Sequence, residues 1–129
     1  MPIEQRIPPD LEAGPWEGQY LDANGFRGTL RLDISRGGRE FEGTFELDIR
    51  DEEGTQRMSG ELRGTTENGI ARIRWYRGKQ GEPVETESRH VFAGSYARQA
   101  LLGMGDPVPD TSFGGGVWIV WRFASKGER

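Results

Sequence analysis

The chain has 129 residues, of which 33% are hydrophobic and 20 are glycine, and it contains no cysteine. This length suits a single domain, and glycine at about twice its usual ~7% argues against a helical bundle. A formal net charge of −4, with no basic stripe, argues against a nucleic-acid binder; the lack of cysteine excludes a disulfide framework and a zinc–thiolate site.

The two ends of the chain differ in composition from the middle. Residues 1–14 contain three prolines and predict an N-terminal arm, residues 125–129 predict a frayed tail, and a single domain is expected over 15–124. The N-terminus lacks the apolar run of a signal peptide, and no segment approaches roughly 18 consecutive apolar residues. We therefore expect a cytoplasmic protein with no membrane partner and no cofactor.

Seven runs between these ends are predicted as strands, because short polar connectors containing glycine or asparagine separate most of them. The predicted strands are 15–21, 26–35, 39–50, 56–65, 69–77, 84–97 and 115–124. Connectors of this kind are typical of hairpins, in which consecutive strands pair antiparallel. The order of elements therefore predicts an up-and-down meander.

Three neighbouring strands alternate between apolar and polar residues. In the run 26–35, for example, Leu30 and Leu32 share one face, and Arg31 and Asp33 share the other. A period of two predicts a sheet with one buried face and one face in water. No segment predicts a helix that could cover the buried face, so we expect the sheet to close into an all-β antiparallel barrel of seven or eight strands.

Five short motifs follow one another along these strands. They are Gly43-Thr44-Phe45-Glu46, Ser59-Gly60-Glu61-Leu62, the run from Ile70 to Trp75, the run from His90 to Tyr96, and the run from Val117 to Trp121. This succession resembles the avidin and streptavidin family over about residues 26–125. The resemblance implies an avidin-like or calycin-like barrel.

The resemblance also implies positions for ligand contacts. The family's stacking tryptophans and a polar contact correspond to Trp75, Phe92, Trp121 and Ser88. However, His90, Phe45 and Leu47 stand where the family has threonine, tyrosine and serine. Because a buried ureido group without partners costs several kcal/mol, we expect no tight biotin binding.

Alternation along the later strands also predicts an interior rich in aromatic side chains. The residues we predict to bind a ligand are Phe45, Trp75, Ser88, His90, Phe92, Tyr96 and Trp121. A barrel of about eight strands is either filled by its own side chains or just able to hold one small ligand, and both alternatives stay open. With a cavity, we expect non-catalytic binding of a small apolar or aromatic molecule.

His90 is the only histidine in the chain. It could contact a ligand, hold a haem iron, or work with Tyr96 in proton transfer if the barrel is a cyclase or isomerase acting on an apolar substrate. The alternative is a structural histidine whose hydrogen bonds are satisfied. We expect no metal site, because there is no second histidine and no cysteine.

The last two predicted strands lack a polar outer face. We predict that Val91, Ala93, Trp118 and Val120 point outward and form an interface. An apolar outer face needs a cover, either a second copy in a homodimer or higher oligomer or the N-terminal arm. A protein-interaction or assembly module with a filled core is therefore the alternative function.

The longest predicted connector, 98–114, combines apolar residues with glycine and proline. Connectors of this length in compact domains are usually functional or disordered. We expect a gate over the mouth of the barrel; the alternatives are an extra strand that completes the barrel and a segment that clasps a neighbouring subunit.

Overall fold

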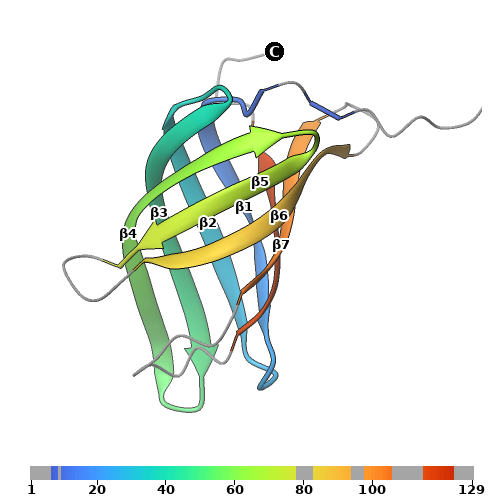
Figure 1. The fold of residues 1–129 in the computed structure, drawn as a ribbon. Coiled ribbons are helices and arrows are strands. Elements are labelled where there is room, and N and C mark those ends of the chain that lie inside the picture. Colours follow the sequence, from blue (N-terminus) through green and yellow to red (C-terminus); the bar gives the residue numbers. More distant parts are fainter. Residues whose placement is uncertain (1–6, 9, 78–82, 94–97, 106–114, 124–129) are drawn as a thin grey trace, which may run out of the picture.

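The computed structural model describes residues 7–8, 10–77, 83–93, 98–105 and 115–123, so the predicted tail lies outside the described residues. Eight strands occur in chain order: β1 (Gly14–Asp22), β2 (Arg27–Arg36), β3 (Glu40–Asp51), β4 (Gly54–Glu67), β5 (Ile70–Tyr76), β6 (Val84–Ala93), β7 (Arg98–Gly105) and β8 (Gly116–Arg122). Each strand pairs antiparallel with the next, and β8 pairs with β1, which closes the barrel (Figure 1). The predicted fold class is confirmed. Within the described ranges, no helix is long and apolar enough to cross a membrane.

Tight turns set the register of the early hairpins. Between β4 and β5, Glu67 pairs with Ile70 across a loop of only Asn68 and Gly69, whose φ angles are 52° and 78°. An asparagine–glycine pair with both φ angles positive is the preferred two-residue hairpin turn, because its twist matches that of the strands. The turn therefore fixes which face of β5 points inward.

The interior follows the predicted alternation in β2 to β6. On β2, for example, Leu30, Leu32 and Ile34 are at most 4% exposed. Opposite them on β3, Phe41 and Phe45 are also buried. These inward residues form one continuous hydrophobic cluster, as expected where antiparallel strands bury one face and expose the other.

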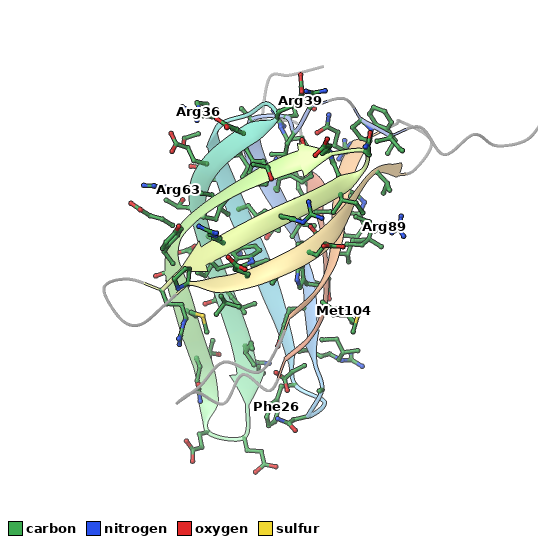
Figure 2. All side chains as sticks on the ribbon, in the orientation of Figure 1. Phe26, Arg36, Arg39, Arg63, Arg89 and Met104 are labelled. Atoms are coloured by element: carbon green, nitrogen blue, oxygen red, sulfur yellow. The ribbon has the colours of Figure 1, made fainter. Side chains whose placement is uncertain are left out.

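The outer face of the early strands is charged and carries cross-strand ion pairs. Arg57 Nε lies 2.7 Å from Asp48 Oδ1, and Arg74 Nε lies 2.7 Å from Glu85 Oε1. Hydrogen bonding from Arg57 lowers the pKa of the Asp48 carboxyl. Exposed pairs of this kind add little to stability, but they keep this face in water; Figure 2 shows Arg63 projecting from it.

The predicted orientation of the last strand is wrong. Trp118 and Val120 are 6% and 0% exposed and face the interior, whereas Val117 is 48% exposed and Trp121 is partly exposed on the outside. Both faces of this strand are apolar, so the alternation of its residues does not indicate which face is buried. Arg122 lies on the same inward face, where it is buried and donates a hydrogen bond to Ala13 O of the N-terminal arm.

The segment 98–114 was predicted as a gate, and for its first half this is wrong. Residues 98–105 form β7, which pairs with both β6 and β8. The alternative of an extra strand that completes the barrel is thus confirmed for these residues, while 106–114 lie outside the described residues. The strand predicted over 84–97 is described only as far as Ala93.

Candidate functional site

The N-terminal arm covers the end of the barrel at which β1 begins (Figure 1). Leu11 is 1% exposed within the core, and its backbone N and O bond Gly38 O and N at 3.3 and 2.8 Å. Next to β1, Arg122 Nε donates to Ala13 O at 2.7 Å. The described part of the arm therefore closes one end of the lumen; we call this the closed end.

His90 belongs to a buried network at the closed end. Gln99 Oε1 accepts a hydrogen bond from Glu12 N at 2.8 Å and lies 3.1 Å from His90 Nε2, while Gln99 Nε2 donates to Asp10 O at 2.9 Å. Because the amide oxygen only accepts, His90 Nε2 carries the proton in this bond. His90 Nδ1 is then an acceptor, buried with no partner among the described residues.

Burial lowers the pKa of the His90 imidazole, although the bond to Gln99 and the charge of Asp10 act the other way. The ring is fully buried, and protonation would place a second N–H where the described residues offer no acceptor. The geometry is that of a structural histidine holding the arm, which was the alternative to a ligand contact.

We expect acid to destabilise the protein through His90. Below the unfolded-state pKa of about 6.5, the unfolded chain takes up a proton that folded His90 resists, so the free energy of unfolding falls as pH decreases from about 7 towards 5. Urea unfolding measured across this range should show that slope. The His90→Gln variant should have a flatter profile, and equal slopes in the two proteins would contradict the assignment.

The opposite end of the lumen contains a cavity of about 70 Å³. We call it the open-end cup; its lining residues are Tyr20, Leu30, Phe45, Leu47, Met58, Trp75, Arg77, Val84, Thr86, Gly105 and Trp118. Ligand pockets usually measure about 300–1,000 Å³, so most of the lumen is filled by side chains. Buried side chains fill the closed end, while the open end keeps this small cavity.

Three aromatic rings define the shape of the cup. Phe45 meets Trp75 edge-to-face at 5.1 Å between ring centroids, and Trp75 meets Trp118 in the same way at 5.7 Å. This arrangement brings the positive edge of one ring against the negative face of the next. Trp75 Nε1 donates to Thr86 Oγ1 at 2.8 Å, so this indole N–H is already satisfied and the rings offer a ligand mainly carbon surface.

The tyrosine of the cup is also satisfied by the protein. Tyr20 Oη donates to Asp22 Oδ2 at 2.9 Å, and Asp22 Oδ1 accepts from Asn24 N at 2.8 Å. Burial and the neighbouring carboxylate both raise the pKa of the Tyr20 hydroxyl. Tyr20 is therefore neutral and presents its ring to the cavity, which suits binding better than proton transfer.

Arg77 is the one charged residue among those that line the cup. Arg77 continues the inward alternation of Ile73 and Trp75, two residues beyond Trp75, so its side chain lies at the mouth of the lumen. Its Nε is buried and has no hydrogen-bond partner among the described residues. By contrast, Arg72 and Arg74 point outward and pair with glutamates of β6.

Two predicted ligand residues, Phe45 and Trp75, line the cup as expected. Trp118 lines it as well, although the sequence placed this residue on the outer face and Trp121 inside. Arg77 was missed, but continuing the period of two past Trp75 would have found it.

Three other predicted ligand residues, Ser88, His90 and Phe92, do not line the cup. Ser88 Oγ donates to Ala71 O at 3.1 Å within the wall of the barrel. His90 is at the closed end, and Phe92 is partly buried on the same strand, two residues further from the cup. Tyr96 lies outside the described residues.

The described residues contain no group of three or more histidine, aspartate or glutamate side chains that could hold a metal ion. The chain matches no protein-family model, and no curated protein or solved structure matches it.

Proposed function

We propose that this protein binds, without catalysis, a small molecule whose aromatic or other apolar part enters the open-end cup. The observation that carries this proposal is the contrast between the two ends. Leu11 and the arm cover an end filled by buried side chains, whereas rings line a cavity at the other end. A lumen built only for stability would be packed at both ends, because unfilled space destabilises a core.

The size of the cup limits what enters it. An apolar cavity of about 150 Å³ holds a benzene molecule, so a cavity of about 70 Å³ admits part of a ring while the rest of the ligand stays outside. Binding at the cup is then driven by burial of apolar surface, at about 25 cal/mol per Å². The filled closed end leaves His90 without access to such a ligand, which favours a binding protein over an enzyme that uses this histidine.

The test uses 4-fluorotoluene, a neutral aromatic probe observed by ¹⁹F NMR. We expect the wild-type protein to broaden its resonance. A Cβ atom at Gly105 would meet no atom within 4 Å, so Gly105→Leu should fill the cup without disturbing the fold and should abolish the broadening. Met104→Leu places the same side chain on the outside and should leave it intact. Equal broadening by the wild-type and Gly105→Leu proteins would overturn the proposal.

A second candidate function is self-association through the outer face of β7, β8 and β1. Here Leu21, Leu102, Met104 and Val117 are 48%, 41%, 71% and 48% exposed, and they line a groove of about 580 Å³. Figure 2 shows Met104 pointing away from the barrel. An apolar patch of this kind on a soluble protein marks an interaction site. The described arm residues close the end of the lumen, so they do not serve as its cover.

A second copy of the chain is the partner that we propose for this face. The β6 side of the groove carries both Glu87 and Arg89, and in the arrangement we propose the two-fold axis places Arg89 of each copy beside Glu87 of the other. The face differs in its members from the predicted one: Trp118 and Val120 point inward, Val91 is partly buried, and the Ala93 side chain lies outside the described residues.

Sedimentation velocity tests the second candidate. We expect the wild-type protein to sediment as a dimer and Val117→Glu to sediment as a monomer, since the carboxylate would be buried without a partner in the interface. The control, Thr44→Glu, adds the same charge to the exposed outer face of β3 and should remain dimeric. A monomeric wild-type protein would rule out self-association.

A further inference from the structure

The open-end cup holds one cationic group whose hydrogen-bonding capacity is not used within the described residues. A guanidinium is always charged and carries five N–H donors, and a buried donor without an acceptor is unfavourable. Arg77 Nε is such a donor, and no ion pair of the described residues includes Arg77. By contrast, the outward arginines of β5 form ion pairs with glutamates of β6, at 3.4 Å for Arg72 Nε and 2.7 Å for Arg74 Nε.

We infer that the cup takes an amphipathic anion, in which an oxyanion such as a carboxylate is attached to an aromatic or other apolar body; this rests on the proposed function. The apolar body lies against the rings of Phe45, Trp75 and Trp118 that line the cup, and the oxyanion accepts hydrogen bonds from Arg77 at the mouth. A guanidinium matches the geometry of a carboxylate, sulfonate or phosphate with two parallel N–H donors.

The residues that line the cup favour an anion, whereas the net charge of the whole chain does not. None of the lining residues is aspartate or glutamate. Asp22, which bonds the cup residue Tyr20, also accepts a hydrogen bond from the backbone of Asn24. Because the net charge of the chain is −4, an anion is not drawn to the protein as a whole, and any preference for an anionic probe reports on Arg77.

The test compares two probes of nearly equal shape, 4-fluorobenzoate and its neutral analogue 4-fluorobenzamide, by ¹⁹F NMR titration at neutral pH. We expect the wild-type protein to bind the benzoate about tenfold more tightly, as a charge-assisted bond predicts. Arg77→Met keeps the apolar stem and should reduce benzoate affinity to that of the amide. Arg77→Lys keeps the charge without the paired donors and should give an intermediate preference.

Arg72→Met serves as the matched control, because it removes the same charge from an outward position of β5 and should leave the preference unchanged. Inorganic phosphate at the same concentration should not displace the benzoate, since phosphate has no apolar body to bury. Full displacement by phosphate would overturn the proposal that the ligand needs an apolar body. Equal affinity of the wild-type protein for benzoate and benzamide would overturn the role of Arg77 while leaving the cup in place. Binding of neither probe, nor of 4-fluorotoluene, would overturn the cup itself.

Discussion

Trp118→Ala is expected to lower the free energy of unfolding by about 3–5 kcal/mol, the usual cost of removing a large buried aromatic side chain. Trp118 is 6% exposed and lies edge-to-face against Trp75 at 5.7 Å. Its removal would leave a void beside the cup that the closed barrel cannot fill by moving one strand. Trp121→Ala, three residues along the same strand, should cost only about 1 kcal/mol, because this side chain is partly exposed on the outer face.

Urea unfolding followed by far-UV circular dichroism measures both variants without relying on tryptophan emission. The two variants control for each other, since both substitutions remove an indole from β8. Trp118→Ala should also enlarge the cup and strengthen the broadening of 4-fluorotoluene, which Trp121→Ala should not affect. If Trp121→Ala were the more destabilising change, β8 would have the orientation that the sequence alone suggested, with Trp121 in the lumen.

The strands whose orientation could be predicted are those with one polar face. On β2, Leu30 and Leu32 alternate with Arg31 and Asp33, and a shift by one residue would bury two charges. Residues 117–121 offer no such contrast, since every side chain in this run is apolar. Their orientation depends on the neighbouring strands and on Arg122, so it could not be derived from the alternation within β8.

The sequence indicates β7 only as an alternative to a gate, for a related reason. Residues 98–105 contain two glycines and only one charged residue, so they show neither alternation nor high strand propensity. They form a strand because both neighbours offer hydrogen-bond partners: Leu101 pairs with His90 on β6 and with Val120 on β8. Such a strand is specified by the closure of the barrel more than by its own sequence.

The closed end depends on contacts that no local pattern encodes. Gln99 joins His90 to the arm through hydrogen bonds to Asp10 and Glu12, which lie 89 and 87 residues away in the chain. His90 is the only histidine of the chain, and its sequence context leaves ligand contact, haem binding, proton transfer and a structural role all open. Only the three-dimensional arrangement shows that its partner comes from β7 and that the arm covers this end.

Gly18→Ala is expected to cost about 3 kcal/mol, at the upper end of the range for inserting a methyl group into a packed site. Gly18 lies on β1 at the seam where the barrel closes and pairs with Val120 of β8. A Cβ atom at this position would collide with the backbone carbonyl of Ile119 and would come within 2.7 Å of Val120 Cα. Backbone atoms of a paired strand cannot turn aside as a side chain can, so the β1–β8 pairing itself would have to widen.

Gly105→Ala is the matched control, because Gly105 also lies on a strand but its Cβ would meet nothing within 4 Å. Replacing this glycine reduces the freedom of the unfolded chain, so the variant should be as stable as the wild-type protein or more stable by up to about 1 kcal/mol. Urea unfolding of the two variants measures how much unfolding free energy is lost through the clash between β1 and β8, apart from the general effect of adding a methyl group. Equal stabilities would mean that β1 and β8 do not approach as closely as their pairing requires, and the closure on which both the cup and the arm depend would then fail.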